Sequence, residues 1–475
     1  DDAAVSWLEQ TLGEPYLHPP LSALTDSDVI LALNSNLDTL HPQALARVLA
    51  AQRRGAKLIV LDEVRGRAAG VADVWLQASP GELGHTLELL VQGMQSRRAG
   101  APGGNAAGAQ APGVDEALAL LAGAERAAIV ASAAALPAAC AASAGALAKL
   151  VSGHRSAADA IYLLRSEANS LGTALMGLAP GRADGTDLWA LLDEQRSLAA
   201  TVMVDEDLAR LIGPEALARL RPKLGALVVL AAFPSPTTEL ADVVLPVATI
   251  GQREGSMMTG DGRVWWLDAI TGAPGDARPA VQVLADLARR MGGRSVGPKP
   301  EAVWEQARWE IPACRAVDIE ALRAGEPVSV LRESLAPSPE PAGVAFAVPE
   351  LVDSDPERPW VLVVRPDEND RAFDPRVRAM VLIERDLRRG RAPYVSMSPE
   401  DLAERRIRPG RRVQIDTRYG KAELQVRQTE GIPAGMIVLP HHFPDLRRVL
   451  CGAGEPGACG GRQWRPVWAG LTPIG

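Results

Sequence analysis

The sequence contains little cysteine, few aromatic residues and no long apolar run. Only four of its 475 residues are cysteines, Cys140, Cys314, Cys451 and Cys459, and none forms a C-x-x-C pair. This scatter argues against a disulfide framework and fits a reducing compartment. It also lacks the tight local group that commonly holds a four-iron cluster. Cys140 lies in an alanine-rich helical pattern, which favours a buried, unreactive thiol over a ligand.

Charge and hydropathy exclude further classes of protein. The net charge of −8 does not suggest a nucleic-acid partner. No apolar stretch approaches the roughly 20 residues that a membrane-spanning helix needs, so membrane attachment is expected only through partner proteins. The sequence begins with Asp and shows no signal-peptide pattern, as expected of a processed or partial chain. Its length and 47% hydrophobic residues suffice for two to four domains.

Apolar runs of strand length alternate with helical patterns over most of the chain. The runs at 28–34 and 56–62 flank a helical segment that ends near Gly55, which together form a β-α-β unit. Similar runs occur at 125–132, 157–164, 198–205, 225–233 and 241–246. The last of them, ADVVLP, is expected to be a buried strand. This alternation predicts a doubly wound parallel α/β fold with two Rossmann-like lobes.

The C-terminal part of the chain has a different pattern. Ser398 is placed to start a short helix, and short strands then alternate with the turn sequences RPGR, RYGK and IPAG. The turn glycines are Gly410, Gly420 and Gly435. This pattern predicts a small β-barrel.

Two stretches have the composition of loops or linkers. Residues 96–114 are rich in Gly and Ala, and residues 335–359 are rich in Pro. The predicted organisation is an α/β domain at 1–185 with a flexible insertion at 96–114, a second α/β lobe at 186–334, a linker at 335–359 and a barrel domain at 360–475.

Polar loops follow several predicted strands, at the edge where doubly wound sheets bind ligands. Asn34, Ser35 and Asn36 follow the first strand, and their short side chains tolerate left-handed backbone and can bind phosphate or ribose. An ordinary turn with a helix N-cap is the alternative. No G-x-G-x-x-G motif supports a classical NAD site. His441 and His442 are adjacent on a predicted strand and should face opposite sides, so they are poor joint metal ligands.

Four ordered segments resemble the molybdopterin oxidoreductase superfamily, which includes formate dehydrogenases, periplasmic nitrate reductases and the large iron-sulfur subunit of bacterial NADH-quinone oxidoreductase. The segments are LTDSDVILALNSNLDTLHP, RRGAKLIVLDEVRGRAAGVADVWLQASPGEL, ADVVLPVATIGQREGSMMTGDGRVW and MSPEDLAERRIRPGRRVQIDTRYG. The resemblance covers nearly the whole chain. It implies formate dehydrogenase-like lobes, a molybdopterin dinucleotide-binding-like barrel, and a pterin cleft beside the glycine-rich loop after ADVVLP.

Besides Asn34, Ser35 and Asn36, the resemblance assigns residues from three further segments to the cleft. These residues are Asn169, Glu254, Gly255, Gly262, Arg263 and His441. The alternative for the glycine-rich loop is a tight turn in which Arg263 pairs with a carboxylate, either Glu254 or Asp261.

The sequence departs from the family at the cofactor loops. An expected Glu falls on Pro236, an expected Asn falls on Thr259, and a DPR motif reads DEV at 62–64. The metal-ligand and iron-sulfur segments of family members lie upstream of this chain's first motif. Since the string EANSLG around Asn169 resembles the large iron-sulfur subunit of NADH-quinone oxidoreductase, the predicted role is a scaffold in the peripheral arm of such a complex. This interpretation predicts a vestigial cleft, no cofactor bound by these residues, and iron-sulfur clusters in upstream residues or partner subunits.

Expected partners are other subunits of that complex, at the cytoplasmic face of the cell membrane, and no nucleic acid. Two alternatives remain. One is the catalytic subunit of a molybdenum or tungsten enzyme, such as a formate dehydrogenase without its N-terminal half, which metal analysis and guanine nucleotide release would identify. The other is a nucleotide-binding or assembly protein, which would purify as a monomer. No acid-base pair or nucleophile stands out, so no catalytic residue or substrate is predicted.

Overall fold

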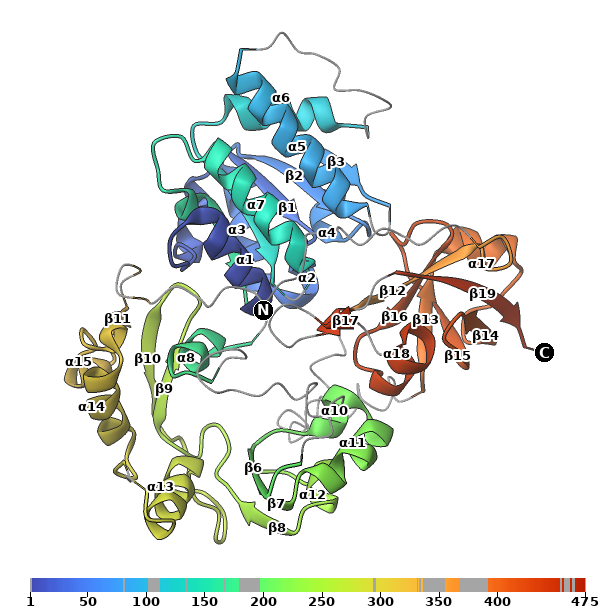
Figure 1. The fold of residues 1–475 in the computed structure, drawn as a ribbon. Helices are drawn as coiled ribbons and strands as arrows, with labels where there is room; N and C mark the ends of the chain where they lie inside the picture. The colour runs from blue at the N-terminus through green and yellow to red at the C-terminus, as the bar shows by residue number, and fades with distance from the viewer. Residues whose placement is uncertain are drawn as a thin grey trace. The chain divides into compact units, whose positions relative to one another are not determined.

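The fold was analysed in a computed structural model. It describes residues 2–474 except 80–81, 101–111, 134, 166, 179–196, 294–295, 331, 333–334, 336–354, 367–391, 453–454, 457–461 and 464–465. Figure 1 shows the order of helices and strands along the chain. The chain divides into two compact units. Unit 1 comprises 1–166, 337–370 and 390–475, and unit 2 comprises 167–336 and 371–389.

Unit 1 contains a five-stranded sheet in the order β3-β2-β1-β4-β5, with every pair parallel. Its strands are β1 (Val29–Leu33), β2 (Lys57–Asp62), β3 (Val74–Gln77), β4 (Ala127–Ser132) and β5 (Ile161–Leu164). β1 and β4 are buried along their whole length because helices cover both faces of the sheet. The predicted parallel α/β fold is confirmed, although the expected strand at 157–164 begins only at Ile161, after a short 3₁₀ turn at Ala157–Ala160.

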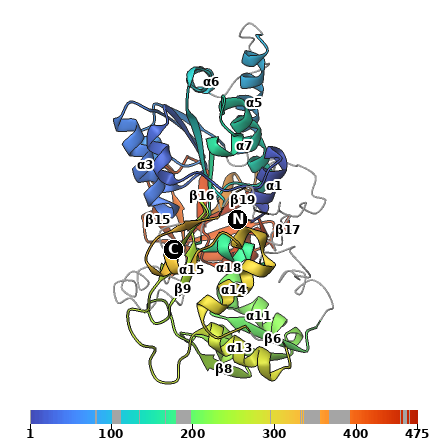
Figure 2. The same ribbon diagram turned by 90° about the vertical axis from the view of Figure 1, so that its left-hand side faces the viewer.

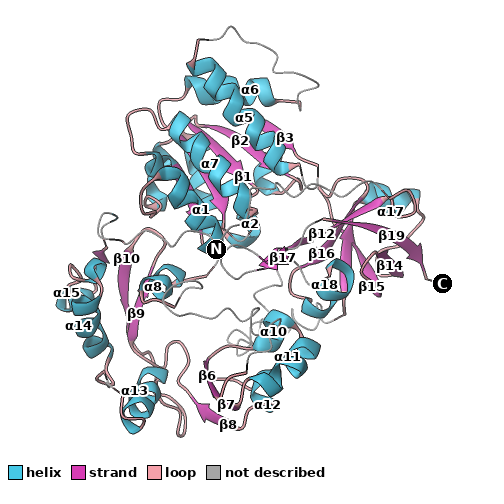
Figure 3. Ribbon diagram, in the orientation of Figure 1, coloured by secondary structure: helices cyan, strands magenta, loops and turns pink. Residues whose placement is uncertain are grey.

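Two helical layers flank this sheet (Figures 2 and 3). One layer consists of α1 (Asp2–Leu12), α5 (Leu83–Arg98), α6 (Val114–Gly123) and α7 (Ala138–Val151). The other contains a 3₁₀ turn (Leu21–Asp26), α3 (Pro42–Arg53) and the short helices α2 (Leu37–Leu40) and α4 (Arg67–Gly70). α5 extends through 96–98, so the helix includes the start of the predicted insertion, and 101–111 lie outside the described residues.

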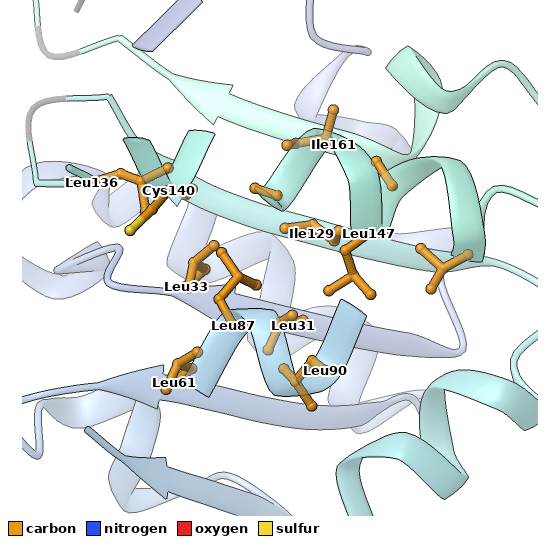
Figure 4. Packing of buried hydrophobic residues seen from close by; sticks show 14 of the residues in the cluster. Leu31, Leu33, Leu61, Leu87, Leu90, Ile129, Leu136, Cys140, Leu147 and Ile161 are labelled. Atoms are coloured by element: carbon orange, nitrogen blue, oxygen red, sulfur yellow. The ribbon is translucent and has the colours of Figure 1, made fainter. Parts of the chain in front are cut away.

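The main core forms between the first helical layer and the sheet. Leu31 and Leu33 of β1 face Leu87 of α5 and Leu147 of α7, and all four are fully buried (Figure 4). Each such leucine contributes roughly 1.5–3 kcal/mol relative to an exposed side chain. The sheet is therefore a rigid base for the loops that follow its strands.

A closed six-stranded barrel occupies the C-terminal part of unit 1, as predicted, in the order β12-β16-β13-β15-β14-β19. Its strands are β12 (Trp360–Arg365), β13 (Tyr394–Met397), β14 (Arg412–Thr417), β15 (Lys421–Gln428), β16 (Met436–Pro440) and β19 (Val467–Pro473). The barrel carries α17 (Pro399–Glu404) and α18 (Pro444–Cys451), and β17 (Glu455–Pro456) pairs with β18 (Arg462–Gln463). Ser398 caps α17 by accepting from the Asp401 amide. Gly410 and Gly435 turn with φ values of 85° and 81°, which favour glycine.

Unit 2 contains a parallel sheet in the order β6-β7-β8 and an antiparallel sheet in the order β11-β10-β9. The strands are β6 (Ala200–Val204), β7 (Ala226–Ala231), β8 (Val243–Pro246), β9 (Gly255–Met258), β10 (Arg263–Leu267) and β11 (Val328–Ser329). The expectation that ADVVLP is buried was wrong, because Val243 and Val244 are each 46% exposed. β8 pairs only with β7 among the described strands and lies at an edge of its sheet.

The helices of unit 2 are short and lie beside these sheets. They are α8 (Ser170–Leu175), α10 (Leu208–Ile212), α11 (Pro214–Leu220), α12 (Pro236–Glu239), α13 (Ala280–Arg290), α14 (Pro300–Glu310) and α15 (Ile319–Arg323), with 3₁₀ turns at Arg221–Lys223 and Pro312–Cys314. Of the helices in the described residues, none is long and apolar enough to cross a membrane. Of the predicted linker at 335–359, residues 336–354 lie outside the described residues.

Candidate functional site

The loop that follows β1 lies at the topological switch point of the sheet. In the strand order β3-β2-β1-β4-β5, the chain moves from β1 to β2 and β3 toward one edge of the sheet, and from β4 to β5 toward the other edge. The direction reverses between the neighbouring strands β1 and β4. Ligands of doubly wound sheets bind in the crevice outside the carboxyl ends of two such strands. Asn34 and Asn36 have left-handed φ values of 36° and 41°. The Asn34 Nδ2 donates to the carbonyl of Ala135, 2.8 Å away, which ties the β1 loop to the loop after β4.

Asn34 also carries a buried acceptor that no described residue satisfies. The residue is only 7% exposed, and its Oδ1 has no hydrogen-bond partner among the described residues. Ser35 beside it is 3% exposed. A buried amide oxygen without a donor costs roughly 1–3 kcal/mol, so the loop is better suited to a ligand that supplies an N–H or O–H.

A histidine and a serine meet at the same edge of the sheet. The Nε2 of His41, which precedes α3, lies 2.9 Å from the Oγ of Ser132 at the end of β4. Ser132 is fully buried, which suits a positioning contact rather than a nucleophile. This pair could not be predicted from the sequence, because nothing in the local pattern of either segment indicates the other.

The end of β2 forms a buried three-charge contact with the barrel. The Nη1 of Arg365 lies 2.9 Å from Asp62 Oδ1 and 3.6 Å from Glu63 Oε2. The three side chains are 12%, 9% and 10% exposed, respectively. Burial acts to lower the pKa of Arg365, but the charges of Asp62 and Glu63 outweigh it and hold that pKa above its usual value. Next to this contact, Asn36 Nδ2 donates to the carbonyl of Pro366 over 3.2 Å.

Apolar and backbone contacts accompany these charges. Val64 packs against a barrel cluster formed by Val361, Val363, Ile432 and Met436. The Arg65 amide donates to the Gly431 carbonyl over 2.9 Å. Gly431 has a φ of 81°, and a Cβ there would lie 2.3 Å from the Arg65 carbonyl oxygen. Residues 62–65, which we call the docking segment, therefore fit closely against the barrel.

The histidine pair lies in a turn just after β16, and not on a strand as predicted. His441 is exposed and His442 is 7% exposed, so the two side chains do face different environments. The His441 amide donates to the Arg365 carbonyl, and its Nε2 lies 2.7 Å from the Nη1 of the buried Arg447. Within the described ranges, no group of three or more His, Cys, Asp or Glu residues could hold a metal ion.

The other predicted site residues gather around the β9–β10 hairpin of unit 2. Asn169 has a φ of 65°, and its Oδ1 accepts from the Met258 amide over 2.8 Å. Gly255 starts β9, and Gly262 turns the hairpin with a φ of 81°. Glu254 makes a longer, exposed contact of 3.4 Å with Arg323. The structure thus brings these residues together. The glycine-rich stretch of the sequence corresponds to the start of β9 and the turn of the hairpin.

Arg263 pairs with Asp261, one of the two predicted carboxylates. Its Nε and Nη2 lie 2.8 Å and 2.6 Å from Asp261 Oδ2. The Asp261 side chain is 3% exposed, while that of Arg263 is 40% exposed. Thr259 Oγ1 donates to the other carboxylate oxygen, so the polar atoms of this turn engage each other.

The described cysteines are buried and protonated. Burial raises the pKa of Cys140 to about 12 and that of Cys314 to about 11. Burial also raises the pKa of Cys451 to about 12, against a smaller opposing effect of Arg447. A thiolate is the form that binds metal, and a raised pKa disfavours it. The predicted burial of Cys140 is confirmed. Cys459 lies outside the described residues.

Two protein-family models match the chain. Residues 109–290 match the family described as Molybdopterin oxidoreductase. Residues 379–462 match the family described as Molydopterin dinucleotide binding domain, over the region that contains most of the barrel.

Curated relatives extend this similarity. The chain is 22% identical to the F420-dependent formate dehydrogenase 1 subunit alpha of Methanococcus maripaludis, over 93% of this chain and 76% of that protein. It is 26% identical to the NADPH-Fe(3+) oxidoreductase subunit alpha of Geobacter sulfurreducens, over 55% of this chain but only 29% of that protein. The chain thus spans less than a third of the latter relative.

A solved structure has the same fold. Acetylene hydratase from Pelobacter acetylenicus superposes with a TM-score of 0.69 at 16% identity, covering 100% of this chain and 81% of that one. At this level of identity the likeness concerns the fold alone.

The family matches correct one expectation from the sequence. The prediction that these residues bind no cofactor is contradicted by the match of 379–462 to a molybdopterin dinucleotide-binding domain, together with the oxidoreductase match. These findings point to a molybdopterin cofactor bound by this chain. Residues 62–64, where the family's DPR motif reads DEV, contact the barrel in this structure.

Proposed function

We propose that this chain, whose residues 109–290 match the molybdopterin oxidoreductase family, is the cofactor-binding part of the large subunit of a multisubunit oxidoreductase. The observation that carries the proposal is the buried Asn34 Oδ1 at the switch point of the five-stranded sheet, which accepts no hydrogen bond from the part of the chain that the structure describes. An acceptor at this position matches the general rule for nucleotide-type ligands in doubly wound sheets.

The residues of the β1 loop fit such a group. Asn34 Oδ1 would accept from an N–H or O–H of the pterin or its nucleotide, while Asn34 Nδ2 holds the loop on Ala135. Burial of Asn34 and Ser35 would exclude water from these contacts and strengthen them. When bound, the cofactor supplies two-electron redox chemistry through its metal. This chain binds and orients it.

Within this function, the finer role we propose is that of the large subunit in the peripheral arm of an NADH-quinone oxidoreductase. It is supported by the resemblance of the EANSLG string around Asn169 to the large iron-sulfur subunit of such complexes, and by similarity to the alpha subunit of an NADPH-Fe(3+) oxidoreductase. Partner subunits would then attach it to the inner face of the cell membrane. A formate dehydrogenase alpha subunit is the second candidate, supported by a relative aligned over 93% of this chain.

One experiment on the native complex tests both the proposed cofactor role and the finer role in an NADH-quinone oxidoreductase. The complex would be purified through a tag on this chain, and its molybdenum, tungsten and acid-released guanine nucleotide would be quantified. We expect stoichiometric metal and nucleotide, and their absence would overturn the proposed cofactor role. Reduction of the complex by NADH but not by formate would support the peripheral-arm role, while the reverse would favour the second candidate.

A further inference from the structure

The docking segment joins parts of unit 1 that are far apart in the sequence. Its four consecutive residues make three kinds of contact with the barrel: the charges of Asp62 and Glu63 meet Arg365, Val64 enters an apolar cluster, and the Arg65 backbone bonds to Gly431. Asn36, in the cofactor loop itself, bonds to the residue after Arg365. The barrel therefore contacts both loops that end β1 and β2.

We propose that Arg365 is a positioning residue that locks the barrel onto the β1 and β2 loops, and that release of this lock admits and discharges the cofactor. The claim about cofactor entry and release rests on the proposed function. The claim that Arg365 holds the barrel in place does not, because it concerns only contacts within this chain.

The charges explain why one arginine can act as a lock. In the docked arrangement, the guanidinium pairs with Asp62, whose side chain is 9% exposed, and lies 3.6 Å from Glu63. Without it, docking would bury the Asp62 carboxylate without this cation, which is strongly unfavourable, whereas in an undocked state water would solvate that carboxylate. Arg365 therefore stabilises the docked arrangement more than the fold of the sheet or of the barrel alone. Its planar guanidinium can approach both carboxylates from one side, which a lysine ammonium does less well.

The position of the lock explains why it would control the cofactor. Asn34 and Ser35 are 7% and 3% exposed with the barrel docked. Asn36 is held by the Pro366 carbonyl directly beside Arg365. Because Asn34 Oδ1 is buried, a ligand reaches it only when a neighbouring segment moves, and the barrel segment at 365–366 contacts this same loop through Asn36.

Hydrogen exchange in the native complex tests the lock at single amides. The Arg65 amide, bonded to the Gly431 carbonyl, reports docking, and the Lys57 amide, bonded to the Asp28 carbonyl at the opposite end of β2, is the internal reference. In Arg365→Met, we expect the Arg65 amide to exchange at least about tenfold faster while the Lys57 amide is unchanged. The matched control is Arg412→Met, which removes an exposed barrel pair with Glu423 and should change neither amide. Arg365→Lys should restore part of the protection.

Cofactor release is the second readout. Pterin loss, followed by the fluorescence of its oxidised form, should be faster in Arg365→Met than in wild type and unchanged in Arg412→Met. Wild-type protection of the Arg65 amide in Arg365→Met, or an unchanged rate of pterin loss, would overturn the proposal. If Arg365→Met does not fold, Asp62→Asn keeps the shape of the site and should shift both readouts in the same direction. If the native complex holds no pterin, the proposed function fails, and the Arg65 amide still decides whether the lock exists.

Discussion

The β1 loop and the β9–β10 hairpin are both polar turns with left-handed residues, yet they use their polar atoms differently. In the hairpin, the Asp261 carboxylate accepts from Thr259 and Arg263, and the Asn169 Oδ1 accepts from Met258. In the β1 loop, the Asn34 Oδ1 is buried and accepts from none of the described residues. Polar composition alone does not distinguish a binding loop from a structural turn, whereas the hydrogen bonds of each polar atom do.

The supports of the two turns differ as well. The β1 loop follows a strand that is buried at all five positions in a five-stranded sheet. The hairpin belongs to a three-stranded sheet in which only Met258 and Val264 of its two strands are fully buried. A rigid base can hold an unsatisfied polar atom in place for a ligand, while the hairpin depends on its own polar contacts.

The largest effect on stability is expected for Arg263→Ala. It removes the cation from an Asp261 carboxylate that is 3% exposed, while the Arg263 side chain itself is 40% exposed. We expect a loss of about 1–3 kcal/mol, below the value for a fully buried pair because solvent screens the arginine. Chemical unfolding followed by circular dichroism measures it.

A matched control is Arg289→Ala, which removes an exposed partner of Asp286 and leaves Arg278 in place. Its expected effect is below about 1 kcal/mol. Equal stability of Arg263→Ala and this control would mean that the Asp261 pair does not support the hairpin, and the contrast between the two turns would fail.

The next effect concerns Asn169. Asn169→Gly permits the same positive φ of 65° but removes the acceptor for the Met258 amide. We expect a destabilisation of about 1 kcal/mol, because one partly buried amide loses its partner. The same unfolding measurement checks it, and an unchanged or increased stability would contradict the structural role assigned to Asn169.

Local sequence patterns predicted much of the fold. Strands such as β1 and β4 are continuous apolar runs, which is typical of parallel strands covered on both faces. β3 was not identified, because its four residues, VWLQ, are too few to show a period. Asn34 and its neighbours were identified because doubly wound sheets place ligands at strand ends. The Arg365 contact could not be predicted, since its partners at 62–63 are brought close only by the tertiary fold.

The smallest effect concerns pH in unit 2. Asp242, just before β8, accepts from the Leu227 amide and pairs with Arg221, which holds the pKa of its carboxyl below the ordinary value of 3.8. A lowered pKa in the folded state means that the stabilisation is complete above the ordinary pKa and is lost as the pH falls below it. Asp242→Asn should therefore lose less stability than wild type on acidification below about pH 4. Parallel acid-unfolding curves for the two proteins would contradict the assignment.

The most direct test of the central claim compares cofactor content in two glycine variants of the full complex. Asn34→Gly and Asn169→Gly each remove an asparagine with positive φ while keeping a residue that tolerates it. Metal and released guanine nucleotide would be quantified per chain for both variants and wild type. The account predicts a large loss of cofactor in Asn34→Gly and wild-type content in Asn169→Gly. Full cofactor content in Asn34→Gly would contradict it.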